Sequence, residues 1–318
     1  MLTAAEQKKP TLWRRARHSF AVARHEPANL IGLVLAIFFA YLILAPVLSI
    51  LVDSFIVQSG DEARTHQDEG SFTLYYIVRT LYSRISEILL WQPLYNTLAI
   101  AAGTVVFSMS IGVVLAWLVN RTNMAGRAWF ATALIVPFML PTWTFALAWT
   151  TIFKNRTVGG QPGWLESLGI TTSNSVAYGY FPIVFILVLH YTPLVILIVG
   201  NALRRLDTQM EDSARVLGAP SRTIAFSIVL PLIRPALMSA ALLIFADCIG
   251  EFAVPYILGL PVRYDTLATG LYRALDTRQN GVAAVIAAVI MIIGVITLLI
   301  DVRMMKEARR FVTVGGKG

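Results

Sequence analysis

The sequence has too few charged residues for a water-soluble protein. Asp, Glu, Lys and Arg make up only 14% of the chain, against about 25% in an ordinary soluble domain. Hydrophobic residues make up 57%, and the mean hydropathy is +0.68. A soluble fold of 318 residues could not bury that much apolar surface. The composition therefore excludes a disordered chain and a typical cytosolic enzyme, and it predicts an all-α, polytopic membrane protein.

Cysteine and the common catalytic motifs are also scarce. Cys248 is the single cysteine, so we expect a small buried side chain and no internal disulfide or cysteine-ligated metal. The four histidines, at positions 18, 25, 66 and 190, lack metal-ligand spacing. The phosphate-binding motif G-x-x-x-x-G-K-[ST] is absent. We therefore expect no ATP or other cofactor on this chain, no metal site and no enzymatic activity of its own.

Six stretches of the chain are long and apolar enough to cross a bilayer. About 20 apolar residues are needed, because the hydrocarbon core is about 30 Å thick. The first stretch, 30–52, lies in a run from 27 to 52 without a charged residue. The other five are expected at 94–119, 129–153, 178–203, 235–258 and 281–300. In the third stretch Pro137 and Pro141 stand one turn apart, which predicts a broken or kinked helix, either as ordinary packing or as a cavity wall or hinge.

The basic residues predict the orientation of these helices in the membrane. With the N-terminus in the cytoplasm, the cytoplasmic segments hold 18 Lys and Arg, and the outer loops hold 8. Because basic residues favour the cytoplasmic side, both termini are expected there, and the net charge of +8 does not imply nucleic-acid binding. The expected parts are a basic cytoplasmic segment (1–29), the first transmembrane helix (30–52), a periplasmic loop (53–91), a five-helix core (92–301) that contains the cytoplasmic loop 204–231, and a basic cytoplasmic tail (302–318).

The loop 204–231 has the pattern of two short helices joined by a sharp turn. Gly218 suits a left-handed helix cap, and either Pro220 or Ser221 suits the start of a second helix, which is expected to end near Leu230, before Pro231. The first helix is predicted from an apolar stripe at helical spacing, formed by Leu206, Met210, Ala214 and Leu217. Such an element presents a small rigid knob to a cytoplasmic partner. The alternative is a solvated helical hairpin without a partner.

The same loop resembles the EAA loop of permease subunits of binding-protein-dependent ABC importers. The family pattern is Glu-Ala-Ala, three residues, Gly, nine residues, Ile, any residue and Leu-Pro. Asp212 stands where the family usually has Glu, and the neighbouring Glu211 could supply the longer carboxylate, so the identity of the acid stays open. With the spacing intact, the pattern falls on Asp212, Ser213, Ala214, Gly218, Ile228, Leu230 and Pro231.

The resemblance extends over nearly the whole chain. The stretches that carry it are 96–98, 116–122, 141–149 and 245–255. The last of them, 245–255, looks most like the ferric iron, thiamine, sulfate and polyamine permeases of the MalF/MalG-like class. The resemblance implies a type I ABC importer transmembrane fold with six helices. It also implies that loop 204–231 is the coupling helix region that docks on an ATPase.

The resemblance further implies a function and a set of partners. The chain would be a non-catalytic permease subunit in a bacterial inner membrane, surrounded by membrane lipid. Its partners would be a cytoplasmic ABC ATPase dimer, which binds the ATP, a second permease subunit (a copy or a paralogue), and a periplasmic substrate-binding protein. The implied substrate is ferric iron or a related small solute. The competing hypothesis is a secondary transporter or channel that works without an ATPase.

Two acids lie within the fifth apolar stretch. Asp247 and Glu251 are four positions apart, so a continuous helix would place them on one face. Carboxylates at membrane depth usually face a cavity or a partner. One hypothesis is that they line a path for a cation such as ferric iron or a polyamine. The other is that they act as an internal cap or a hydrogen-bond acceptor between helices. His190 and Tyr191 are expected to be packing and hydrogen-bonding groups.

Overall fold

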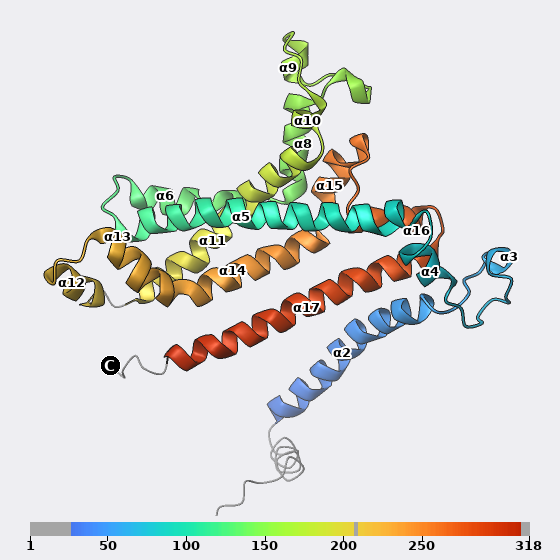
Figure 1. Ribbon diagram of the computed structural model, residues 1–318, viewed down its shortest axis with the longest axis horizontal. Coiled ribbons are helices and arrows are strands. Elements are labelled where there is room, and N and C mark those ends of the chain that lie inside the picture. Colours follow the sequence, from blue (N-terminus) through green and yellow to red (C-terminus); the bar gives the residue numbers. More distant parts are fainter. Residues whose placement is uncertain (1–26, 207–208, 313–318) are drawn as a thin grey trace, which may run out of the picture. The chain divides into compact units, whose positions relative to one another are not determined.

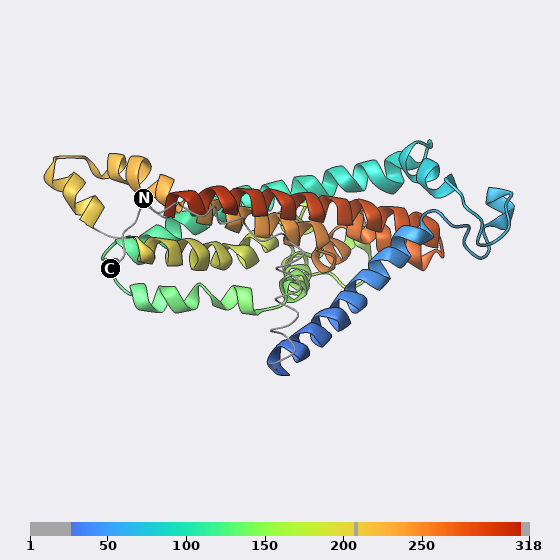
Figure 2. The same cartoon turned by 90° about the horizontal axis from the view of Figure 1, so that it is seen from below.

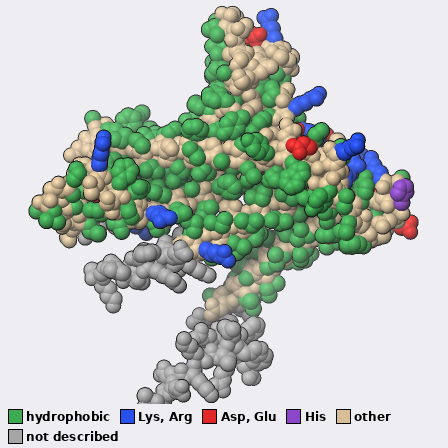
Figure 3. Space-filling view, viewed as in Figure 1, with side chains coloured by type: hydrophobic (Ala, Val, Ile, Leu, Met, Phe, Trp, Pro, Cys, Tyr) green, Lys and Arg blue, Asp and Glu red, His purple; other side chains and the backbone are tan. Residues whose placement is uncertain are grey.

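The computed structural model describes residues 27–206 and 209–312, and it divides at Asp53 into two compact units. Within these residues every element is helical, and the one strand-like feature is an antiparallel bridge between Ile56 and Phe72. Five helices are long and apolar enough to span a membrane, and a bent pair makes a sixth if it is counted as one span. Apolar side chains dominate the face shown in Figure 3.

The first unit contains one described helix, α2 (Pro27–Asp53). It includes the whole of the predicted first span, 30–52. Its side chains are apolar on every side. A helix with this uniform apolar surface is typical of a membrane span that faces lipid.

Four long helices of the second unit lie side by side in two perpendicular views (Figures 1 and 2). They are α5 (Gln92–Arg121), α11 (Tyr180–Arg205), α14 (Leu230–Gly250) and α17 (Asn280–Val312). α11 is the most buried of the four, and it packs against both α5 and α14. The predicted second, fourth and sixth spans correspond to α5, α11 and α17.

Small residues allow α5 and α11 to approach closely. A Cβ atom added to Gly112 of α5 would lie 2.6 Å from the Cβ of Val195 on α11. A Cβ atom added to Gly200 of α11 would lie 2.9 Å from the Nδ2 of Asn120 on α5. Membrane helices associate mainly through such close packing, because lipid supplies no hydrophobic drive between them. The glycines therefore fix the α5–α11 contact along much of its length.

The third predicted span is broken, as its two prolines indicate. It consists of α6 (Arg127–Ala133), α7 (Val136–Met139) and α8 (Thr142–Phe153). The two halves meet at an angle of 88°. Pro137 opens α7, while Pro141 has extended backbone and stands directly before α8. A proline suits a helix start because the missing N–H has no intrahelical partner there.

The fifth span differs from its predicted bounds, 235–258. The helix is already formed at Ser221, runs through α13 (Ser221–Thr223) and a π-helical turn, η3 (Ile224–Val229), into α14, and ends at Gly250. A separate short helix, α15 (Ala253–Leu258), follows. The expectation that the second helix of loop 204–231 would end near Leu230 is therefore wrong.

A π-helical turn explains why the chain passes Pro231 without a break. Pro231 has no N–H to donate to the carbonyl four residues earlier, and that residue, Ser227, lies inside η3. The same arrangement precedes α5, where η1 (Glu87–Trp91) contains the residue four positions before Pro93. The wider π turn accommodates the missing hydrogen bond within a continuous helix.

The remaining elements connect the long helices. The segment before α5 is anchored to α17 by Tyr76, whose ring lies against Gly281, where an added Cβ would be 2.5 Å from ring carbons. Its hydroxyl donates to Asp61 Oδ2 at 2.9 Å and accepts from the Gln58 amide at 3.0 Å. Burial raises the pKa of Tyr76 to about 12. The other elements are α3 (Glu62–Thr65), α4 (Tyr75–Leu81), η2 (Arg156–Val158), α9 (Trp164–Ser167), α10 (Asn174–Ala177), α12 (Gln209–Val216), η4 (Leu260–Val262) and α16 (Leu267–Asp276).

Candidate coupling loop and transport pathway

The turn between the two helices of loop 204–231 is built on Gly218. α12 ends at Val216, and Gly218 has a φ of +81°, the left-handed conformation expected of it. The Gly218 amide donates to the Arg215 carbonyl at 2.9 Å, and the Ala219 amide donates to the Ala214 carbonyl at 3.0 Å. These bonds satisfy carbonyls that the helix end would otherwise leave open. The sequence therefore identified this turn correctly.

The two neighbouring acids of α12 point in different directions. The Glu211 side chain is only 7% exposed, and its Oε1 lies 3.1 Å from Nη2 of Arg121. The Asp212 side chain is 61% exposed and pairs with Arg215 of the same helix at 3.1 Å. Glu211 thus faces the membrane helices, whereas Asp212, at the family's usual acid position, faces outward. The two acids are not interchangeable.

Arg121 is a site residue to which the sequence reasoning assigned no role. It is the last residue of α5, and its Nη2 also donates to the Leu203 carbonyl of α11 at 2.7 Å. The only signal in the sequence was its place in stretch 116–122, which resembles the family. Its partner Glu211 lies far away along the chain, so spacing alone could not identify the pair.

Three large apolar side chains are exposed on and directly after α12: Met210, Val216 and Leu217 are 55%, 88% and 87% exposed. Ala214 packs against the buried core instead, while Ser213 is exposed. The predicted apolar stripe is therefore split between the two sides. Exposed apolar side chains grouped on one small helix are typical of a protein-binding surface. Of the other motif residues, Ile228 lies in η3, and Leu230 and Pro231 open α14.

α14 ends between Asp247 and Glu251, so the two acids do not lie within one continuous helix as predicted. Asp247 lies in the last turn of α14 and is exposed. Glu251 follows the helix end with extended backbone, at a ψ of 119°. Its Oε1 accepts from the Val254 amide at 3.1 Å and from the Thr142 hydroxyl at 3.2 Å. Glu251 therefore connects the end of α14 to the start of both α15 and α8.

His190 lies close to these acids. Its ring packs against Phe138 with centroids 5.3 Å apart and meets Tyr191 edge-on at 4.9 Å. It interacts electrostatically with both Asp247 and Glu251. Polar groups from the third, fourth and fifth spans thus meet where two of these spans are interrupted. Tyr191 and Cys248 are buried. In residues 27–206 and 209–312, no three His, Cys, Asp or Glu side chains are placed to hold a metal ion.

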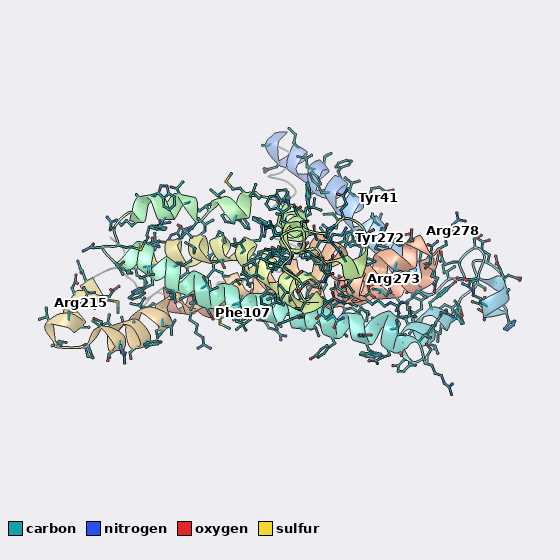
Figure 4. The ribbon with its side chains drawn as sticks, turned by 90° about the horizontal axis from the view of Figure 1, so that it is seen from above. Tyr41, Phe107, Arg215, Tyr272, Arg273 and Arg278 are labelled. Carbon is teal, nitrogen blue, oxygen red and sulfur yellow. The ribbon has the colours of Figure 1, made fainter. Side chains whose placement is uncertain are left out.

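The loop that contains α12 lies at one end of the second unit, opposite to α4 and α16 (Figure 1). In Figure 1 α12 and α13 lie at one end of the long helices, and α4 and α16 lie at the other. Figure 4 shows Arg215 at the α12 end, with Arg273 and Arg278 at the opposite end. A movement of α12 must therefore pass along the long helices to reach the opposite end.

A known protein family matches most of this chain. The family described as the binding-protein-dependent transport system inner membrane component matches residues 108–306. The matched region contains α11, α12, α14 and the Gly218 turn.

Curated relatives are about a quarter identical to the chain over the aligned residues. ModB, a molybdenum transport system permease protein of Escherichia coli (strain K12), is 27% identical over 66% of this chain and 91% of the relative. A probable sulfate transport system permease protein, cysT, of Prototheca wickerhamii is 26% identical over 64% of this chain and 78% of the relative. A putative ferric transport system permease protein, FbpB 1, of Haemophilus influenzae is 25% identical over 91% of this chain but only 43% of that protein.

Solved structures share the fold. A chain of a bacterial ABC transporter involved in the import of the acidic polysaccharide alginate has a TM-score of 0.65 at 16% identity, covering 95% of this chain and 99% of that chain. A chain of the inward-facing MetNI methionine ABC transporter has a TM-score of 0.51 at 17% identity, covering 74% of this chain and 100% of that chain. At these identities the likeness concerns the fold alone. The observed fold is thus the type I ABC importer transmembrane fold.

Proposed function

The chain belongs to the family of binding-protein-dependent transport system inner membrane components, and from this membership we propose its partners, its pathway and its cargo. It is a permease subunit of an ABC importer and has no catalytic role, because ATP hydrolysis lies with a partner ATPase. Family membership favours this function over that of a secondary transporter or channel. The observation that carries the proposal is α12, a short helix with exposed apolar side chains that ends at the Gly218 turn inside the matched region.

The proposed ATPase contact is the outer surface of α12. Met210, Val216 and Leu217 supply exposed apolar area, and Asp212 and Arg215 supply charges at its edge. Such an apolar centre with a charged rim is the usual composition of a protein interface. Two permease subunits each present this surface, and one cytoplasmic ATPase dimer binds both copies of it. This places α12 in the cytoplasm, together with both termini.

A second permease subunit is proposed to face Asp247. An acid in the last turn of a helix is electrostatically unfavourable, because the helix dipole is negative there. A carboxylate that faced lipid at this depth would also be costly. Since Asp247 is nevertheless exposed, we place it on the surface that meets a second subunit, a copy or a paralogue, across a water-filled pathway. The assembly lies in the bacterial inner membrane and receives its cargo from a periplasmic binding protein.

Ferric iron is the proposed cargo. The putative ferric permease is similar to 91% of this chain. Carboxylate oxygens are suitable transient partners for a hard cation, and Asp247 supplies them on the exposed surface of the fifth span. A second candidate is an oxyanion, since permeases for sulfate and molybdenum are among the relatives.

The test uses a double variant, Asp247→Asn with Glu251→Gln, which removes both charges but keeps the size of each side chain. Glu251→Gln retains an oxygen that can accept the hydrogen bonds from Val254 and Thr142. The complex is reconstituted with its ATPase and binding protein in vesicles, and uptake of labelled ferric iron, sulfate and molybdate is measured. Asp276→Asn, an exposed acid at the end of α16, is the matched control.

We expect the wild-type complex to import ferric iron. The double variant should assemble normally but take up at least about tenfold less iron, because the carboxylates interact with the cation. The Asp276→Asn control should retain full uptake. Import of sulfate or molybdate instead of iron would reject the cargo and leave the permease function intact. Unchanged iron uptake in the double variant would reject the carboxylate pathway.

A further inference from the structure

Arg121 joins three helices at the end of the second unit that carries α12. It closes α5, its Nη2 donates to the Leu203 carbonyl in the last turn of α11 at 2.7 Å, and the same Nη2 lies 3.1 Å from Glu211 of α12. The Arg121 and Glu211 side chains are only 11% and 7% exposed. A single guanidinium therefore contacts two membrane helices and the helix proposed to bind the ATPase.

The electrostatic surroundings stabilise the guanidinium at this point. The C-terminal ends of α5 and α11 are the negative ends of two helix dipoles, and both lie next to Arg121. Glu211 lies in the first turn of α12, where its negative charge interacts favourably with the positive end of the helix dipole. A buried pair holds its geometry more strictly than an exposed one, because loss of either partner leaves an uncompensated buried charge.

The other contacts of α12 are less suited to transmit a force. The Asp212–Arg215 pair is exposed and lies within the helix itself. Met210, Val216 and Leu217 point outward. The ion pair of Glu211 with Arg121 joins α12 to α5, and Ala214 adds apolar packing.

We propose that Arg121 is a positioning residue that makes α12, α5 and α11 move together, so that movement of the ATPase is passed to the membrane helices through its guanidinium. The inference rests on the proposed function. The α5 and α11 ends are braced further, since Arg204 donates to Asn120 at 3.3 Å and to Asn201 at 2.5 Å. These hydrogen bonds and the close contacts at Gly112 and Gly200 hold α5 and α11 together, so a displacement at Arg121 moves α5 and α11 as one body.

The first measurement concerns the mechanical link and needs no partner protein. In a Cys248→Ser background, spin labels are placed at Val216→Cys on α12 and Val114→Cys on α5, both exposed positions. The distance distribution between the labels is measured by pulsed EPR on the full chain in lipid nanodiscs. We expect Arg121→Gln and Glu211→Gln to broaden this distribution about twofold, because α12 loses its buried anchor.

The control and the conservative variant are chosen from the same end of the helices. Arg303→Gln removes one exposed positive charge from the last part of α17 and should leave the distribution unchanged. Arg121→Lys keeps the charge, but a single ammonium does not reproduce the planar guanidinium, so an intermediate width is expected. If Arg121→Gln does not insert, Arg121→Lys and Glu211→Gln still test the link.

The second measurement concerns transmission. In the reconstituted complex, we measure the ratio of substrate taken up (ferric iron, sulfate or molybdate) to ATP hydrolysed. Co-purification of the ATPase with each variant is measured as well. We expect Glu211→Gln and Arg121→Gln to keep the ATPase bound and hydrolysing, and to import about tenfold less per ATP. Arg121→Lys should recover part of this ratio. A residue with only a structural role would lower assembly and leave the ratio unchanged.

The two measurements separate the inference from the proposed function. Unchanged distance distributions in both neutral variants would overturn the link whatever the chain transports. Broad distributions with an unchanged ratio of uptake to hydrolysis would overturn the transmission and leave the importer function standing. A wild-type complex that neither binds an ATPase nor imports would reject the proposed function, while the distance measurement would still decide the link.

Discussion

At the scale of the residue, Gly218 shows how one backbone conformation sets the form of the coupling loop. Its φ of +81° lies in the left-handed region, which costs an ordinary L-residue roughly 1–2 kcal/mol. An added Cβ would meet nothing within 4 Å. The requirement for glycine is therefore one of backbone strain and not of space.

We predict that Gly218→Val leaves membrane insertion intact but abolishes transport, because a β-branched residue moves α12 away from its position. Gly218→Asn should retain most of the transport, since asparagine tolerates the left-handed conformation better than other residues with a side chain. Both variants are compared for ATPase co-purification and uptake in vesicles. Wild-type uptake by Gly218→Val would remove the turn from the coupling role.

Residue-scale prediction from the sequence succeeded where the signal was local. Gly218 was identified because a glycine directly after an amphipathic helical stretch commonly forms a left-handed helix cap. The roles of Arg121 and Glu251 depend on partners distant in sequence; Thr142 and Glu251 are 109 positions apart. Neither residue's contacts produce a periodic pattern in the sequence. The choice between Glu211 and Asp212 as the key acid of the loop, and the role of Asp247 and Glu251, therefore stayed open.

At the scale of the element, apolar length predicts where helices lie but not where they are interrupted. Residues 251–258 stay mostly apolar, so hydropathy extended the fifth span through them. The interruption arises because Glu251 accepts from the Val254 amide and the Thr142 hydroxyl, which satisfies a new helix start. The prolines gave a clearer signal in the third span, where two of them mark the bend.

The contact between α5 and α11 gives an element-scale prediction. Gly112→Ala should destabilise the protein by about 1–3 kcal/mol, because the new methyl group overlaps Val195 in a packed contact. Gly294→Ala on α17 is the control, since nothing lies within 4 Å of its added Cβ, and it should be neutral or stabilising by up to about 1 kcal/mol. Thermal unfolding in detergent measures both. Equal stability of the two variants would show that the helices do not pack as closely as described.

At the scale of the whole molecule, the sequence predicts six spans and cytoplasmic termini, and the fold agrees with five or six apolar helices. A reporter fused after residue 318 should therefore behave as cytoplasmic. One inserted at Gly60, in an exposed turn with a φ of +89°, should behave as periplasmic. The reason is the excess of basic residues on the cytoplasmic side. A periplasmic signal from the C-terminal reporter would mean that the bent pair α6–α8 does not cross the membrane.

The close fit of α5 and α11 has a consequence for the cell's energy supply. Where a methyl group does not fit between two helices, a hydrated ion cannot pass between them. A subunit that has been made but not yet assembled would then carry no leak along this contact. Such a subunit would not dissipate the proton gradient through this contact while it remains unassembled.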